Sequence, residues 1–594
     1  MSYVSCMGLG AYIGIMNNRL TANIPFLLLG LGVDDAFVLA SEFNRARRMG
    51  LGSIEEQIVA ATKFGGVSIL ITSLTDAAAF LLGATTSLPA LGWFCLFAGM
   101  GVIFCYLFQI FFFLPCLCIN AKREDKGLLD LLCCVTAKAE HTFEEPQGCC
   151  GCGTCGKPDQ LEGHMDRWST WLVSNAGTIF AAVSFLALFG LGAAGCAQQY
   201  TDFQIEYFVP EGSYLKTFYA QNADNFASAT PCSVYIQNYD MYPGETYAAE
   251  TDSMGKMFAY LNSTHLVSRE SDIGAWWMPY QAFHTQYFED GAKWTKAEFY
   301  QSILDWTYIE AGGVPIFSRF RGDIKWASAG CNDEDDRKNA TLCDASLGIV
   351  ATKWSFNLAL EHTGGTDACA AAKPPTCSWD RFRTMEELRA KTAEIIDTAF
   401  PYTYSFLNWE ETGVIGGEFV RNVAICAGTV FLMIIFLIPY PRIALLVMLN
   451  IILSVTEVIG FMFWWGSPIN GISTIYILIS VGLVVDYSAH IGHMFAISAG
   501  TSAERTVKAM TRIGPSVFNA IVSTLLAVIV IAFSSTYIFQ TFFRALFLTV
   551  IIGGSHGLVL LPVLLRLLGG SRDADGEGAT ELKDPSSGIE VHPV

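Results

Sequence analysis

Long runs of apolar residues recur along the chain. Nine of them lie at about 23–41, 66–85, 92–119, 171–195, 420–440, 443–465, 472–494, 515–535 and 543–567, with a partial run at 1–16. Each of the nine is long enough to form a helix that crosses about 30 Å of hydrocarbon. The pattern predicts a polytopic α-helical membrane protein with about nine or ten spans.

A polar insert at 197–419 separates the fourth apolar run from the fifth. It contains a strand-like stretch at 233–236 and a helical pattern from Met385 to Phe400, which together predict an α+β domain. Its many Trp and Tyr side chains allow two interpretations. They form an ordinary hydrophobic core, or they line an apolar conduit for a lipid.

The positive charges predict the orientation. Lys and Arg cluster in three short loops that fall on one side when the spans alternate, and such loops stay in the cytoplasm. The insert at 197–419 therefore faces the exterior or a lumen. It carries two glycosylation sequons, at Asn262 and Asn339, as that orientation requires.

The segment order suggests six regions. These are helices at 1–119, a cytoplasmic Cys-rich loop at 120–170, a span at 171–195, the insert at 197–419, a five-helix group at 420–567 and a disordered tail at 568–594. Residues 1–16 lack the charged start and the cleavage site of a signal peptide. Because Met1 opens inside an apolar run, we expect the chain to be truncated at its N-terminus.

Composition narrows the function. Only 15% of the 594 residues are charged and the formal net charge is −19, which excludes the basic footprint that a nucleic-acid partner needs. The sequence contains no nucleophile–base pair, phosphate loop or metal-hydrolase pattern, so we expect neither an enzyme nor a cofactor or metal site.

The chain contains an internal repeat. A glycine precedes an aspartate by four residues at Gly30 and Asp34, and again at Gly482 and Asp486. Each copy opens another span some thirty residues later, and each ends in a Leu-Pro pair, at 114–115 and 561–562. Because both copies run in the same direction, an axis along the membrane normal should relate them.

Asp34, Asp35 and Asp486 lie well inside apolar spans. An ionised aspartate at mid-membrane costs about 2.5–3.5 kcal/mol on insertion scales, and these spans contain no Lys or Arg. Either the carboxylates bind protons or a cation bridges carboxylates from two helices. Repeat symmetry should bring the helices together, and small residues allow that approach; the candidates are Gly30, Gly32 and Gly482.

Two further residues extend this hypothesis. Asp76 either belongs to the relay or forms a hydrogen bond within its own bundle. His490 follows Asp486 by one helical turn on the same face, so it either passes protons toward the cytoplasm or is an interfacial histidine. A structural polar contact remains the alternative for the aspartates themselves.

The repeat and its motifs resemble the resistance–nodulation–division superfamily, in particular its Patched, Patched-related and Niemann–Pick type C branch. The matching residues are 32–35 with the surrounding helices, which look like a sterol-sensing domain, and the stretches at 207–210, 213–215, 482–490, 554–558 and 561–562. The resemblance implies two parallel repeats of the RND type and one α+β lumenal domain. Members have twelve spans and two such domains, so the resemblance implies that this sequence lacks a first span, a first domain, a second span and part of the third.

The resemblance also implies a function. It indicates a transporter of sterol or another lipid, driven by protons or a monovalent cation that move through the intramembrane aspartates. The alternatives are a Patched-like receptor or sterol sensor without transport, and an inactive truncated fragment. The expected partners are sterol or other lipid, protons or a monovalent cation, and the lipids of the bilayer.

Cysteines on the two sides of the membrane have different expected roles. Outside, disulfides are expected, and two local pairs are candidates, Cys331 with Cys343 and Cys369 with Cys377; Cys232 is either free or paired with Cys196. The crowded cysteines of the cytoplasmic loop at 120–170 fit S-acylation, a metal site or no specific role.

Overall fold

The computed structural model covers residues 1–594. It describes all of them except 49–51, 127–157, 205–206, 208, 211, 219–220, 222–229, 243–251, 270–271, 288–293, 312–313, 334–341, 360–376, 439 and 573–594. The chain forms two compact units, one made of Met1–Gln199 with Ile415–Val594 and the other of Tyr200–Val414. The cytoplasmic cysteines, Cys369, Asn339 and most of the predicted tail lie outside the described residues.

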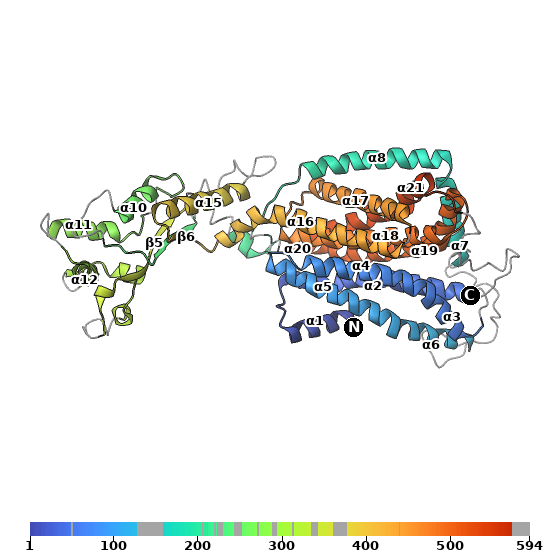
Figure 1. Ribbon diagram of the computed structural model, residues 1–594, viewed down its shortest axis with the longest axis horizontal. Helices are drawn as coiled ribbons and strands as arrows, with labels where there is room; N and C mark the ends of the chain where they lie inside the picture. Colours follow the sequence, from blue (N-terminus) through green and yellow to red (C-terminus); the bar gives the residue numbers. More distant parts are fainter. Residues whose placement is uncertain are drawn as a thin grey trace. The chain divides into compact units, whose positions relative to one another are not determined.

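The first unit is a bundle of long helices. Its first half contains α1 (Ser2–Ile13), α2 (Ile24–Arg48), α3 (Ile54–Ala61), α4 (Val67–Gly83), α5 (Pro89–Phe108) and α6 (Leu114–Asp125). Its second half contains α7 (Pro158–Leu172), α8 (Asn175–Ala197), α16 (Phe406–Leu437), α17 (Pro441–Trp464), α18 (Gly471–Ile497), α19 (Ser502–Ile529), α20 (Tyr537–Ser555) and α21 (Leu561–Leu568). Within the bundle, the N-terminal helices form one side, and α8 runs along the opposite edge beyond α17 (Figure 1).

Nine helices among the described residues are long and apolar enough to cross a membrane. They correspond to the nine predicted runs and confirm a polytopic α-helical membrane protein. The partial run at 1–16 forms only the 12-residue α1. The run at 171–195 begins later than predicted, because the chain turns between α7 and α8, where Ser174 caps α8 by accepting a hydrogen bond from the Gly177 amide at 3.2 Å.

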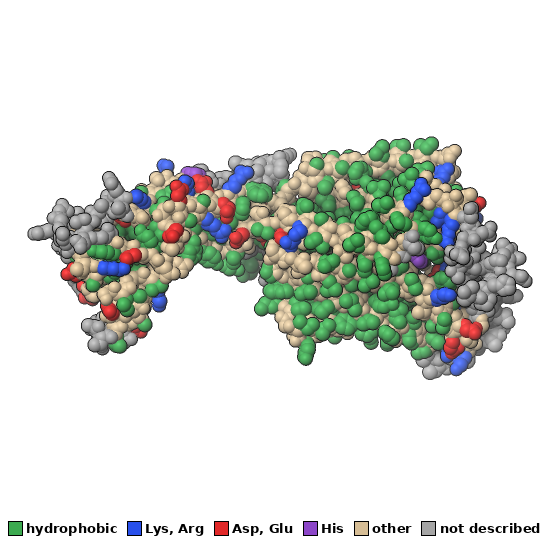
Figure 2. Space-filling view, viewed as in Figure 1, with side chains coloured by type: hydrophobic (Ala, Val, Ile, Leu, Met, Phe, Trp, Pro, Cys, Tyr) green, Lys and Arg blue, Asp and Glu red, His purple; other side chains and the backbone are tan. Residues whose placement is uncertain are grey.

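The surface of the bundle is that of a membrane protein. Large apolar side chains are exposed along its outer helices, for example Val183 at 64%, Leu186 at 73% and Phe436 at 82%. Figure 2 shows this apolar surface over the bundle, with Lys and Arg side chains gathered at the end that holds α3, α6 and α7. Exposed apolar area of this extent is stable only against hydrocarbon.

Helix α18 is the centre of the bundle. Its sequence is apolar on every face, which is typical of a helix buried all round, and its most apolar window is completely buried. Neighbouring helices bind two of its polar side chains: Asn450 on α17 donates to Ser488 at 3.0 Å, and Thr549 on α20 donates to Ser480 at 2.6 Å. The helix with the second repeat's aspartate is thus fixed from several sides.

The repeat extends to the backbone. A five-residue π-helical turn precedes the Leu-Pro pair in each half, at Gln109–Phe113 and at His556–Leu560. Each turn contacts the aspartate-bearing helix of the same half. In the first half, Gln109 Nε2 donates to the Gly32 carbonyl at 2.5 Å. In the second half, a Cβ at position 557 would lie 2.8 Å from the Tyr487 carbonyl oxygen. Such turns are often found at functional sites.

The second unit is an α+β domain, as predicted. Strands β1 (Pro231–Gln237), β4 (Ile324–Trp326), β5 (Ile349–Asn357) and β6 (Ala399–Tyr402) form a sheet in the order β4-β5-β1-β6, and β2 (Glu310–Ala311) pairs with β3 (Val314–Pro315). Its helices are α10 (Ser253–Ser263), α11 (Trp277–Tyr287), α12 (Lys296–Trp306) and α15 (Cys377–Ile395). The helix predicted from Met385 to Phe400 begins earlier and ends sooner, because Phe400 belongs to β6 and pairs with Tyr235.

The aromatic residues of this unit form a core. Trp276, Trp277, Tyr280, Tyr300 and Trp306 are at most 1% exposed, and their rings contact one another edge-on or tilted, as between Trp276 and Trp277 at 5.6 Å. Of the two interpretations, the packing therefore supports the ordinary core over the conduit.

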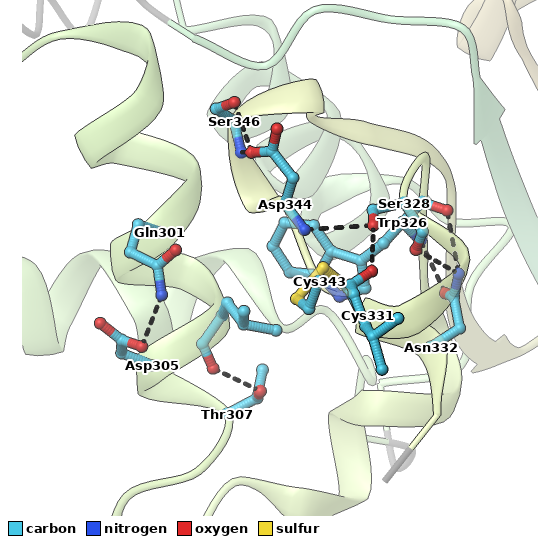
Figure 3. The surroundings of a disulfide bond; sticks show 12 residues. Gln301, Asp305, Thr307, Trp326, Ser328, Cys331, Asn332, Cys343, Asp344 and Ser346 are labelled. Carbon is cyan, nitrogen blue, oxygen red and sulfur yellow. Dashed lines mark hydrogen bonds between the residues drawn. A yellow bond between two sulfur atoms is a disulfide. The ribbon is translucent and has the colours of Figure 1, made fainter. Parts of the chain in front are cut away.

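Disulfides occur where the chain is expected to face the oxidising side. Cys331 and Cys343 are joined, with Cα atoms 4.5 Å apart. Ser328 stabilises this loop by donating to the Leu342 carbonyl at 3.0 Å, and Figure 3 shows it accepting from the Asp344 amide at 3.1 Å. Cys377 is also disulfide-bonded, to a residue outside those described. Cys232 and Cys196 are both free, so that pairing is not formed. Asn262 lies exposed near the end of α10.

The closest helix contact in the first unit gives a stability prediction. A Cβ at position 460 on α17 would lie 1.8 Å from the Gly192 carbonyl oxygen on α8, whereas one at position 428 on α16 would meet nothing within 4 Å. Gly460→Ala should lower the free energy of unfolding of the detergent-solubilised protein by about 1–3 kcal/mol, and its melting temperature should fall. This loss is expected although alanine is favoured over glycine within a helix by about 1 kcal/mol. Gly428→Ala should not lower it; equal melting of both variants would contradict this packing.

Candidate functional site

Four buried carboxyl side chains lie inside the bundle, within electrostatic reach of one another. Asp34 and Asp35 come from α2, Asp76 from α4 and Asp486 from α18, and these residues are 2–7% exposed. They belong to both repeats, because α2 and α4 lie in the first half and α18 in the second. We refer to Asp34, Asp35, Asp76 and Asp486 as the aspartate cluster.

The members of the aspartate cluster interact electrostatically with one another. Asp486 lies within electrostatic reach of Asp34, Asp35 and Asp76, and Asp76 is within reach of Asp34. Helix α18 approaches α4 so closely that a Cβ at position 482 would lie 2.7 Å from Asp76 Oδ1. Only glycine at position 482 allows this approach without a shift of the carboxyl group.

The hydrogen bonds of the aspartate cluster are incomplete. Asp35 accepts a bond from Ser73 at 3.2 Å. One carboxyl oxygen each of Asp34, Asp76 and Asp486 is buried without a hydrogen-bond partner among the described residues, and no Lys or Arg in the described part pairs with any of the four. Because unsatisfied buried polar atoms are costly, the arrangement leaves room for a species that binds there transiently.

The three candidate packing glycines differ in their surroundings. Gly482 meets Asp76 as described, and a Cβ at position 32 would lie 2.6 Å from Cys105 Sγ on α5. A Cβ at position 30 would meet only Thr524 at 3.6 Å, which is ordinary contact. Close helix approach therefore depends on Gly32 and Gly482, and position 30 has space for a methyl group.

His490 lies one turn from Asp486 toward the cytoplasmic end of α18. It is 2% exposed, so it is buried inside the bundle. Its Nδ1 is 2.7 Å from Ser68 Oγ on α4, and its Nε2 has no partner among the described residues. The ring borders a cavity of about 20 Å³, which is large enough for one water molecule.

An ion pair borders the same cavity. Arg512 on α19 contacts Glu42 on α2 through two hydrogen bonds of 3.2 and 3.3 Å, and both side chains line the cavity together with Ser68 and His493. The sequence interpretation counted Arg512 only as a cytoplasmic charge and did not consider Glu42. No local spacing could have paired them, since 470 residues separate them.

A second buried pair joins α17 to the π-helical turn that follows α20. His556 Nε2 on the π-helical turn is 3.2 Å from Glu457 Oε1 on α17, and both side chains are at most 1% exposed. The sequence interpretation missed Glu457, although an acid inside the apolar run at 443–465 was a visible signal. Glu457 is not within the aspartate cluster.

Potential metal ligands do not gather in groups of three in the described part of the chain. The aspartate cluster offers unpaired oxygens that lie within electrostatic reach of one another.

Two substitutions distinguish a relay from a structural contact. If Asp486 is not needed for packing, Asp486→Asn should melt at or above the temperature of the unchanged protein. The amide has nearly the same shape as the carboxyl group, but it is not ionisable, so no charge has to be desolvated. Glu42→Gln should lower the free energy of unfolding by about 1–3 kcal/mol and so lower the melting temperature, because it leaves Arg512 without its ionic partner. Thermal unfolding of the detergent-solubilised chain measures both; a lower melting temperature for Asp486→Asn would support the structural contact.

Comparison with known proteins agrees with these features. The family model described as the sterol-sensing domain of SREBP cleavage-activation matches residues 1–137. The NPC intracellular cholesterol transporter 1 of Sus scrofa is 24% identical over 609 residues, covering 96% of this chain and 46% of that protein. Protein patched homolog 1 of Caenorhabditis elegans is 23% identical over 656 residues, covering 97% of this chain and 46% of that protein.

A solved structure shows the same fold. The hedgehog release protein Disp from the water bear Hypsibius dujardini aligns with a TM-score of 0.58 at 11% identity, over 96% of this chain and 66% of that chain. The chain spans about half the length of the two curated relatives. The predicted resemblance is therefore confirmed: this multi-pass membrane protein has the fold of the resistance–nodulation–division superfamily and is homologous, over most of its length, to the Niemann–Pick C1 and Patched proteins.

Proposed function

We propose that the protein moves a sterol or another membrane lipid and that protons passing through the aspartate cluster drive the movement. The observation that carries this proposal is that four buried carboxyl groups from both repeats lie within electrostatic reach of one another. Among the described residues, three of them have an unpaired oxygen and none has a basic partner. The similarity to a protein named a cholesterol transporter supports the lipid class.

The cluster suits protons better than a resident cation. Carboxyl groups that share a dry interface titrate as a coupled set, and a proton needs no coordination shell. The described residues provide no group of three ligands for a metal ion. Proton binding therefore satisfies the unpaired oxygens with the chemistry that the cluster offers.

A path toward the cytoplasm supports the same proposal. His490 lies on the face of α18 that carries Asp486, and its free Nε2 and the one-water cavity lead to Glu42 and Arg512. A proton that leaves the cluster can pass through His490 and the water to the cytoplasmic end. Ser68, bonded to Nδ1, fixes the orientation of the ring.

Proton binding would change how the two halves interact. With the carboxylates ionised, Asp486 on α18 repels Asp34 and Asp35 on α2 and Asp76 on α4 across the interface between the repeats. Neutralising them removes that repulsion and favours a closer contact. A packed interface with two discrete arrangements converts such a local change into a rigid-body movement.

Sterol flux in vesicles tests the proposal. The whole chain, reconstituted with a fluorescent sterol and a pH gradient, should transfer sterol to acceptor vesicles faster with the gradient than without it. The double variant Asp34→Asn with Asp486→Asn should lose this gradient-dependent part, because it removes exchangeable protons from both repeats. Fluorescence transfer to the acceptor vesicles provides the measurement.

Glu457→Gln serves as the matched control, since Glu457 is equally buried in the bundle but outside the aspartate cluster. It should keep the gradient-dependent flux. Equal flux with and without the gradient would contradict proton coupling, and a sodium gradient that drives flux in its place would assign the role to a cation.

A specific observation favours a second candidate, a sterol sensor without transport. The sterol-sensing-domain match covers residues 1–137, which contain three of the four clustered aspartates.

A photoactivatable sterol distinguishes the two candidates. A sensor should label residues 1–137 and show no flux, and its labelling should be the same in Asp34→Asn with Asp486→Asn. For a transporter the same variant keeps labelling but loses flux that the unchanged protein has. Peptide mapping of the labelled chain, alongside the flux assay, decides between them.

A further inference from the structure

A groove of about 520 Å³ lies in the second half of the bundle, away from the aspartate cluster. Helices α7, α19 and α20 form it together with the π-helical turn that follows α20. Its volume falls in the range of ligand sites. The walls are chiefly large apolar side chains, two each from α7 and α19 and one each from α20 and the turn: Met165, Trp168, Phe518, Ile521, Ile551 and Leu558.

The groove borders segments that cross the membrane. Its α19 and α20 walls belong to two of the candidate membrane-spanning helices. Helix α7 precedes the span α8 and carries Trp168 and Trp171, with ring centroids 5.2 Å apart and both residues more than a third exposed. Tryptophans of this kind mark the membrane interface, so the groove opens to the hydrocarbon of the cytoplasmic leaflet.

The walls select the kind of lipid. No Lys, Arg, Asp or Glu is among the residues that line the groove, and its polar side chains besides the Trp168 indole are His164 and Ser555. Ser555 donates to the Ile552 carbonyl at 2.8 Å, which leaves its oxygen free to accept. A phosphate group would find no charged partner there, whereas a single hydroxyl group would.

A rigid apolar body fits these walls better than a flexible chain. Ordering a flexible acyl chain costs conformational entropy that a fused-ring body does not lose. A lipid with a rigid ring system and one hydroxyl group therefore matches the chemistry of the groove.

The same turn of helix that walls the groove also contacts α18. Position 553 lies against Val484, where a Cβ would be 2.9 Å away, and position 557 lies against the Tyr487 backbone. Val484 and Tyr487 flank Asp486. On the other face, Gly554 and Leu558 line the groove, and the Leu558 carbonyl accepts a hydrogen bond from the Trp168 indole at 3.3 Å.

We propose that the groove between α7, α19 and α20 is a binding site for a sterol-class lipid of the cytoplasmic leaflet, and that an occupant bears on α18 through the turn at 553–558. The binding part stands without the proposed transport. The second part rests on it, because it makes groove occupancy a regulator of the aspartate cluster.

Photolabelling tests the binding part. The purified chain is placed in phosphatidylcholine vesicles with a diazirine sterol, or with a phosphatidylcholine that carries the diazirine on its acyl chain. The sterol probe should label peptides that contain 161–168, 518–521 or 550–559, and unlabelled sterol should compete. Ile551→Trp, which fills the groove, should lose this labelling.

Ile529→Trp provides the matched control. Ile529 and Ile551 are both 44% exposed on membrane-spanning segments, but Ile529 does not line the groove, so its variant should label like the unchanged protein. Labelling by the phospholipid probe alone, labelling that Ile551→Trp leaves intact, or an internal cross-link from residues 127–157 to the groove would each overturn the proposal.

The flux assay then tests the link to α18. Ile551→Trp should change the gradient-dependent sterol flux, and Ile529→Trp should not. If labelling behaves as expected but the unchanged protein shows no gradient-dependent flux, the groove stands as a lipid site and the proposed transport fails. If flux is gradient-dependent but Ile551→Trp leaves it unchanged, the proposed transport stands and the regulatory part is wrong.

Discussion

The structure depends on the cost of holding four carboxyl groups in a low-dielectric interior without a basic partner. Such groups are expensive at mid-membrane, and the bundle does not reduce the cost with Lys or Arg near them in its described part. It places them where α2, α4 and α18 converge, so each group is shielded from hydrocarbon and faces another carboxyl group. The central position of α18, buried on every face, follows from this requirement, because a helix with Asp486 and His490 could not border lipid.

Parallel repetition explains how the cluster forms. Each half contributes one long helix with an aspartate four residues after a glycine, and each half ends in a π-helical turn before a Leu-Pro pair that contacts that helix. The first turn reaches Gly32 through Gln109, and the second reaches Tyr487 through Gly557. The halves differ in what else they bury: the first adds Asp76, and the second adds the pair Glu457 and His556 outside the cluster. Because of this asymmetry, the first half supplies three of the four carboxyl groups of the aspartate cluster.

Sequence patterns predicted what depends on local spacing. Length and hydropathy gave the nine spans, and the repeated Gly-x-x-x-Asp gave the meeting of Asp34 and Asp486, because symmetry relates the two helices. The sequence could not predict side-chain partners that depend on how two helices are rotated against each other. Ser68 with His490 and Glu42 with Arg512 are such pairs, and each is more than 400 residues apart. The end of α15 was wrong because sheet pairing with Tyr235 places Phe400 in β6 despite its helical pattern. Gly30 belongs to the repeated Gly-x-x-x-Asp pattern, but a Cβ at this position would meet only ordinary contact. A glycine that recurs in the repeat therefore need not lie in a tight helix contact.

Helix α20 connects the chemistry of the interior to the membrane surface. Its positions 553 and 557 are glycines with almost no space before α18, so α20 and its π-helical turn cannot shift toward α18 without moving Val484 and Tyr487. On its other face the turn meets the groove and the Trp168 indole, and neither contact is as close. A force on α20 from the lipid side is therefore passed to α18, whereas movement of α18 toward α20 is accommodated at the groove. The close side meets α18 beside Asp486 and the open side lines the groove, so an occupant of the proposed site would act on the buried carboxyl group without touching it.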